Sequence, residues 1–276
     1  MLDAALAMVN ATGLTVSLDH LSFEDVIRDA RVSRSTVYRR WPYKDLFFSD
    51  LLKELARAAT PASVSSEQTS LPEIRRVVLE HLDWLRTPDR RPELILELIR
   101  RGAVPEFETM HRSTEWRTYL ALHATYLSVA DDELRRDLQE ALARSERDFI
   151  GRIAAAWQRL VGLFGYRLRP ALGATFEDFA SMASADLRGH VILSLADPRI
   201  GTRRLHVRAL GATQAADWSP PGLALASIAQ AFFEPDPDIT WDEARVAALL
   251  QALESGAGPE SSLSIDGSPG DDAQVR

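Results

Sequence analysis

Basic side chains are concentrated in one short part of the chain. Between Arg28 and Lys44 the sequence holds six basic residues against one acidic residue, Asp29. The basic residues are Arg28, Arg31, Arg34, Arg39, Arg40 and Lys44. Because the whole chain has a net charge of -8, this local excess of positive charge needs an explanation. Arginine and lysine mixed with Ser, Thr and Tyr hydroxyls can bind phosphates and the edges of nucleic-acid bases.

Two short helical patterns separated by a turn position this basic segment. Ser22 can cap the first helix and Ser33 the second, because each hydroxyl can accept a bond from a free amide. The second helix should end before Pro42, since proline disfavours helical geometry in the preceding residue. On a helical wheel Val37 and Trp41 point inward. The caps, the outward side chains and the start of the next helix form the candidate DNA contacts: Ser22, Ser33, Arg34, Ser35, Thr36, Tyr38, Arg39, Arg40 and Lys44.

Apolar residues repeat with helical periodicity almost throughout, and strand signals are weak. The expected fold class is all-α, with a three-helix N-terminal domain at 1–57 and a larger helical bundle at 58–254. A polar segment at 60–70 marks the boundary. The tail at 255–276, rich in Gly, Ser, Pro and Asp, is expected to be disordered. Helices of the second domain are predicted at about 71–86, 93–101, 107–128, 131–165, 175–196, 220–234 and 241–254, with a break at Gly102 and Pro105.

The segments LDAALAMV and SFEDVIRDARVSRSTVYRRWPYKDLFFSDLL resemble the DNA-binding domain of the TetR/AcrR family of transcriptional regulators. The resemblance covers residues 2–57, and beyond them only an all-helical layout is shared. It implies a helix-turn-helix that binds a palindromic double-stranded DNA operator. It also implies a second domain that forms a homodimer and binds a small-molecule effector, so that the effector releases a repressor from DNA.

The chain departs from the family pattern in and around the turn. Arg31 stands where Gly is usual, because that turn favours positive φ; a non-Gly residue costs about 1 kcal/mol, or the turn differs. Ile27 replaces a small Ala, Tyr43 replaces a Ser, and the segment after Gly13 is a few residues longer. The alternative interpretation is therefore a degenerate family member without effector response or without DNA binding.

Aromatic residues of the second domain could line an effector pocket with a few polar groups. The candidates are Trp84, Trp116, Tyr119, His123, Tyr126 and Trp157. The helices at 131–165 and 175–196 could form a four-helix dimer interface across a two-fold axis. Its candidate residues are Phe149, Trp157, Phe176, Phe179, Ala183 and Leu187. The alternative for both sets is ordinary packing within one chain.

Other kinds of function find little support in the sequence. Cys is absent and the six His are scattered, so no metal site is expected. A helical small-molecule enzyme is disfavoured, because no paired carboxylates, nucleophile–base pair or phosphate-binding loop stands out. No cofactor is expected. No apolar run reaches the roughly 18 residues of a membrane span, and the chain is expected to be cytoplasmic with no membrane partner.

Overall fold

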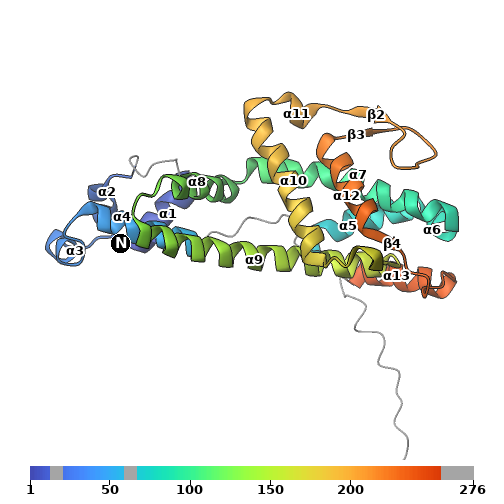
Figure 1. Cartoon of the computed structure of the whole chain (residues 1–276), viewed down its shortest axis with the longest axis horizontal. Coiled ribbons are helices and arrows are strands. Elements are labelled where there is room, and N and C mark those ends of the chain that lie inside the picture. Colours follow the sequence, from blue (N-terminus) through green and yellow to red (C-terminus); the bar gives the residue numbers. More distant parts are fainter. Residues whose placement is uncertain (13–20, 59–66, 256–276) are drawn as a thin grey trace, which may run out of the picture.

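The computed structural model describes residues 1–12, 21–58 and 67–255, and the prediction of a mostly helical fold is confirmed. The longest helix, α9 (Asp132–Leu163), runs along the length of the molecule (Figure 1). Its first half packs against α4 (Lys44–Ala58), and its second half packs against α10 (Phe176–Ala196). α9 is therefore the element that connects the two ends of the structure.

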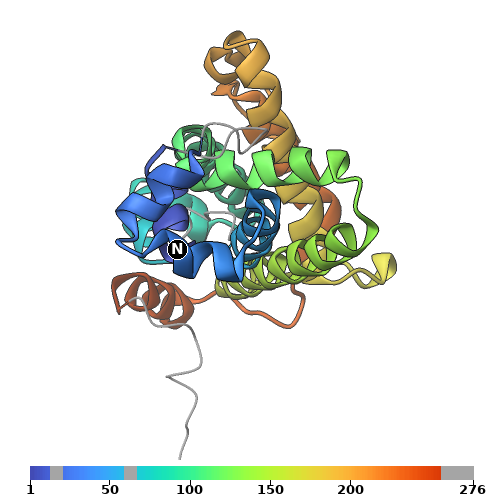
Figure 2. The ribbon, with the colours of Figure 1, turned by 90° about the vertical axis from the view of Figure 1, so that its left-hand side faces the viewer.

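The other helices divide between one end of the molecule and its body (Figure 1). α1 (Leu2–Thr12), α2 (Phe23–Asp29) and α3 (Arg34–Arg40) lie with α4 at one end, which faces the viewer in Figure 2. The body contains α5 (Glu67–Glu80), α6 (Leu82–Arg86), α7 (Arg91–Arg112), α8 (Thr114–Ser128), α12 (Pro220–Phe232) and α13 (Glu243–Ser255). The short α11 (Arg199–Thr202) follows α10, and 3-10 turns occupy Pro88–Arg90 and Pro170–Leu172.

In the described part of the chain, four short strands form two antiparallel pairs, which the weak strand signals did not predict. β1 (Tyr166–Leu168) pairs with β4 (Phe233–Pro235), so that Tyr166 lies opposite Pro235. β2 (Leu205–Val207) pairs with β3 (Ala216–Trp218), so that Leu205 lies opposite Trp218. Both pairs join segments around the helical body and leave the all-α character of the fold unchanged.

One hydrophobic cluster, here called the N-terminal core, crosses the predicted domain boundary. From α2, α3 and α4 it contains Val26, Val37 and Leu51, which are at most 2% exposed. From the other side it contains Ala121 and Leu122 of α8 and Leu138, Ala141 and Leu142 of α9. An ion pair of 2.6 Å between Lys53 and Asp137 lies beside it. The end of the molecule that carries α3 is thus packed directly on α8 and α9.

The predicted break at Gly102 and Pro105 is wrong, because α7 continues through both residues. A proline inside a helix costs about 3 kcal/mol. Burial of Ile99, Ala103 and Phe107 on one continuous apolar face opposes that cost. The helix instead ends at Ser113, whose hydroxyl accepts from the Trp116 amide at 3.0 Å and starts α8.

Two other boundaries differ from the prediction. The single helix expected at 71–86 is divided at His81 into α5 and α6. The segment expected to be a linker at 60–70 already becomes helical at Glu67, where α5 begins. Most of the lengthened segment after Gly13, residues 60–66 of the expected linker and the tail at 256–276 lie outside the described residues.

Candidate functional site

The turn between α2 and α3 is built as the sequence indicates. The Ser22 hydroxyl accepts from the Asp25 amide at 3.3 Å and starts α2. α2 ends at Asp29, and Arg31 then takes a φ of 53°, in the left-handed region. Of the two alternatives for Arg31, the structure shows the positive-φ turn, with an arginine where a glycine would be free of strain.

α3 is held at both of its ends. The Ser33 hydroxyl accepts from the Thr36 amide at 3.3 Å and lies 2.8 Å from the Thr36 hydroxyl, so it caps the helix. At the other end Trp41 is 7% exposed, and its indole Nε1 donates to Asp50 of α4 at 2.9 Å. With Val37 also buried, α3 is anchored along its inward face.

The candidate DNA contacts lie where the sequence places them. All six residues from Arg34 to Arg40 other than Val37 are exposed, and Lys44 is exposed at the start of α4. Ser22 and Ser33 are exposed caps at the starts of α2 and α3. An open hollow of about 330 Å³ lies beside α3. Thr36, Arg39, Arg40 and Trp41 line this hollow together with Met1, Val32 and Val37. The surface therefore offers hydroxyl and guanidinium donors around a shallow concavity.

One acidic residue of this surface was missed by the sequence analysis. Glu24, on α2, lies 2.7 Å from the guanidinium of Arg34 through Oε2. Its other oxygen, Oε1, accepts from the Tyr38 hydroxyl at 3.2 Å. The Tyr38 ring also packs edge-on against Phe23 at 5.8 Å between ring centroids. The only sequence signal was a carboxylate two residues after the Ser22 cap, which is also an ordinary position for an acid at a helix start.

The structure does not bring the six candidate effector residues together. Trp84 belongs to a cluster with α5 and α13, and Trp157 to one with α10 and α12. Trp116 is fully buried in a small cluster with Phe107, and Tyr126 lies at the edge of the N-terminal core. Among the described residues, the one ring contact within this set joins Tyr119 and His123, at 4.1 Å between ring centroids. The aromatic residues fill separate parts of the core.

Partly buried polar groups contact Tyr119. Its hydroxyl donates to Glu146 at 2.6 Å, and Arg188 of α10 lies 2.8 Å from the same carboxylate. Burial, followed by the hydrogen bond to Glu146, raises the pKa of Tyr119 above its usual value of 10.0. This contact fixes α8, α9 and α10 to one another.

The candidate dimer residues face the interior of the chain. Phe149, Phe179 and Ala183 are at most 8% exposed, because α9 and α10 pack against each other within the chain. Trp157 contacts Phe179, at 4.9 Å between ring centroids. Phe176 and Leu187 are partly buried on the same inward face of α10. Within one chain these contacts fit the alternative of ordinary intrachain packing, and the dimer interface itself stays a prediction.

The opposite face of α10 is apolar and exposed. Met182 is 51% exposed, Ile192 47% and Leu193 56%, and Ala185 is exposed between them. At 100° per residue these side chains share one side of the helix. The sequence of α10 has apolar residues on two sides of the helix, which is consistent with one buried and one exposed apolar face.

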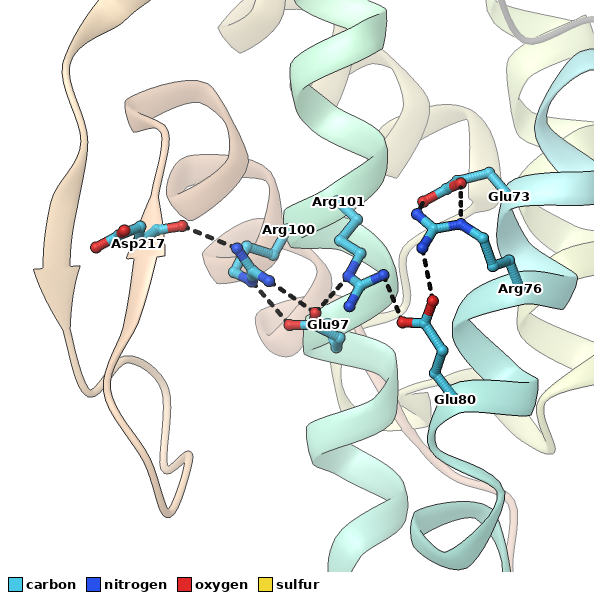
Figure 3. Close-up of polar contacts among 7 residues, drawn as sticks. All are labelled: Glu73, Arg76, Glu80, Glu97, Arg100, Arg101 and Asp217. Carbon is cyan, nitrogen blue, oxygen red and sulfur yellow. Dashed lines mark hydrogen bonds and ion pairs between the residues drawn. The ribbon is translucent and has the colours of Figure 1, made fainter.

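A chain of ion pairs connects α5 and α7, and a hydrogen bond to a backbone carbonyl extends it to the β2–β3 pair (Figure 3). Glu97 of α7 lies 2.7 Å from Arg100 and 2.6 Å from Arg101. Arg100 also donates a hydrogen bond to the backbone carbonyl of Asp217 at 3.1 Å, and Arg101 forms an ion pair with Glu80 of α5 at 2.8 Å. Burial opposes the ionisation of Glu97, but the hydrogen bonds from both arginines outweigh it and lower its pKa. These contacts hold the body together.

Neither a metal centre nor a transmembrane helix is evident in the described ranges. No group of three or more metal-ligating His, Asp or Glu side chains occurs among residues 1–12, 21–58 and 67–255. In the same residues no helix has the length and apolarity needed to cross a membrane. Comparisons of the chain with protein-family models, curated proteins and solved structures found no match.

Proposed function

We propose that the protein is a DNA-binding transcriptional regulator in which α2, the turn at Arg31 and α3 form a helix-turn-helix. The observation that carries this proposal is the division of α3 into two faces. Val37 and Trp41 are buried, whereas Arg34, Tyr38 and Arg39 are exposed on a basic surface. A recognition helix needs such a division, because one face must hold it to the domain while the other meets bases and phosphates.

Each exposed side chain has a chemical role in this proposal. Arg39 and Arg34 can donate two hydrogen bonds to O6 and N7 of a guanine. Ser35, Thr36 and Tyr38 can reach bases or phosphates, and Arg40 can neutralise a phosphate. Lys44 lies in the first turn of α4, where the free amides of the helix favour an anion as well.

We propose a homodimer that places two copies of α3 in successive major grooves of a palindromic operator, about 34–36 Å apart. The exposed apolar face of α10, with Met182, Ile192 and Leu193, supports a second copy of the chain as its occupant. Two such faces can pair across a two-fold axis, because the same patch then meets itself. This surface replaces the inward-facing residues as the proposed interface.

Regulation by a small-molecule effector requires coupling between the body and α3. The N-terminal core supports a route, because Leu122 of α8 and Leu142 of α9 pack in the same cluster as Leu51 of α4. A ligand that shifts α8 or α9 would change the position of α4 and hence the spacing of the two recognition helices. A ligand that binds more tightly to the dimer whose helix spacing does not fit the operator would release the repressor from DNA.

DNA binding by the full chain tests this proposal. The chain should shift duplex fragments from the region upstream of its own gene at low salt, and the affinity should fall steeply as salt rises. Arg39→Ala should weaken operator binding by about 1–3 kcal/mol if Arg39 contacts a base. Arg112→Ala, which changes an exposed arginine of α7 far along the chain from α3, is the matched control and should leave binding unchanged. Absence of any salt-sensitive shift would exclude the proposed function.

A further inference from the structure

The carboxylate of Glu24 is positioned against two side chains that would contact DNA. It lies 2.7 Å from Arg34 and accepts from Tyr38 at 3.2 Å, and these residues are one helical turn apart on the exposed side of α3. Both partners remain largely accessible, since the side chain of Arg34 is 73% exposed and Tyr38 is 43% exposed. Glu24 thus contacts the guanidinium of Arg34 and the hydroxyl of Tyr38, two hydrogen-bond donors on the face of α3 that is proposed to bind DNA.

Arg39 on the same helix differs from Arg34 in this respect. Among the described residues Arg39 makes no ion pair, and it lines the open hollow on α3. Asp25, the neighbour of Glu24, pairs with Arg28 at 2.8 Å within α2 and does not reach α3. The restraint therefore joins one acid on α2 to Arg34 and Tyr38 of α3.

We propose that Glu24 is a selectivity residue, which restrains Arg34 and Tyr38 so that only a site with suitable acceptors displaces its carboxylate. This inference rests on the proposed DNA-binding function. A phosphate that approaches Arg34 must compete with Glu24 and is repelled by its charge, which weakens binding to any sequence. A guanine at the correct position offers two uncharged acceptors, O6 and N7, and replaces the lost contacts without that repulsion. Glu24 thereby lowers affinity for random DNA more than affinity for the operator, which is selection against the wrong partner.

Glu24→Gln tests the restraint, with Asp25→Asn as its matched control. Each change removes one negative charge from the first turn of α2, but only Glu24 contacts α3. Binding of the full chain is measured by fluorescence anisotropy on a labelled duplex of random sequence and on its upstream fragment, between 50 and 200 mM salt. We expect Glu24→Gln to tighten random-duplex binding about two- to tenfold beyond the control, because a released exposed ion pair is worth at most a small factor. The slope of log affinity against log salt should steepen by about 0.9, the value for one additional phosphate contact.

A second pair of variants assigns the gain to Arg34. In the Arg34→Ala background, Glu24→Gln should no longer tighten binding, because the side chain it releases is missing. Thermal melting of every variant checks that α2 and α3 remain folded. Equal random-duplex affinities for Glu24→Gln and Asp25→Asn would overturn the restraint while leaving DNA binding in place. If Glu24→Gln alone binds DNA, the restraint is supported, and if neither variant nor the unaltered chain binds, both proposals fail.

Discussion

The indole Nε1 of Trp41 donates a hydrogen bond of 2.9 Å to the Asp50 carboxylate, and this bond fixes the end of α3 to α4. Trp41 also packs edge-on against Phe47 of α4, at 5.2 Å between ring centroids. Since Trp41 is the first residue after α3, the orientation of the helix depends on these contacts.

Asp50→Ala should destabilise the protein by about 1–3 kcal/mol, because it leaves the indole N–H of a buried tryptophan without an acceptor. Asp50→Asn keeps an amide oxygen at the same position and should cost less. Urea unfolding followed by tryptophan fluorescence measures both. Equal losses for the two variants would show that the hydrogen bond is not the stabilising contact.

The anchoring of α3 was predictable because its causes are local. The caps at Ser22 and Ser33 and the inward placement of Val37 and Trp41 follow from residue type and from the 3.6-residue period. The positive φ at Arg31 was one of two alternatives, and the neighbouring residues alone do not choose between them. The contact of Glu24 with α3 depends on how α2 and α3 cross, which a one-dimensional pattern does not contain.

Arg31→Gly should raise the free energy of unfolding by up to about 1 kcal/mol, because glycine adopts the φ of 53° without a Cβ clash. Greater freedom of the unfolded chain reduces this gain. Arg28→Gly is the control, since Arg28 lies within α2, where glycine costs about 1 kcal/mol relative to alanine. The midpoint of chemical denaturation should therefore rise for Arg31→Gly and fall for Arg28→Gly. A loss of stability with both variants would contradict strain at Arg31.

Leu193→Glu should convert the proposed dimer to a folded monomer, because it buries an unpaired charge in the apolar face of α10. Leu195→Glu is a matched control. The two leucines are 56% and 53% exposed, but they point about 160° apart around the helix. Analytical ultracentrifugation measures the mass of each variant. A Leu193→Glu protein that remains dimeric would place the interface elsewhere.

Glu97→Gln should lower the free energy of unfolding at neutral pH. It should also make that free energy less dependent on pH in the acidic range. The pKa of Glu97 is lower in the folded protein than in the unfolded chain. Its stabilising contribution is therefore complete above the unfolded pKa of about 4.3 and is lost as the pH falls through the folded value. Melting curves between pH 3 and 7 test this expectation.

The expected result is a lower melting temperature at pH 7 and a smaller difference from the unaltered chain at pH 3. Glu73→Gln, at the exposed margin of the same ion-pair chain, should have a smaller effect, because exposed ion pairs contribute little. A Glu97→Gln protein as stable as the unaltered chain at pH 7 would show that the contacts in Figure 3 do not hold α5 and α7 together.

The sequence could not predict which face of α10 packs inside the chain and which is exposed, because both faces are apolar. Phe179 and Ala183 on one face and Met182 and Leu193 on the other satisfy the same helical periodicity. The positions of α9, α12 and α7 determine which face is covered. The continuity of α7 through Pro105 has a similar cause, since distant packing partners offset a local penalty.

The N-terminal core has a consequence for engineering. Because Leu122, Leu138 and Leu142 complete the packing of α1 and α4, a fragment ending at residue 57 would expose an apolar surface to water. The segment from α1 to α4 is therefore not an independent unit that can be fused to another protein. Under the proposed function, substitutions that change DNA preference have to be made on α3 in the intact chain, or in a graft that includes α8 and the first half of α9.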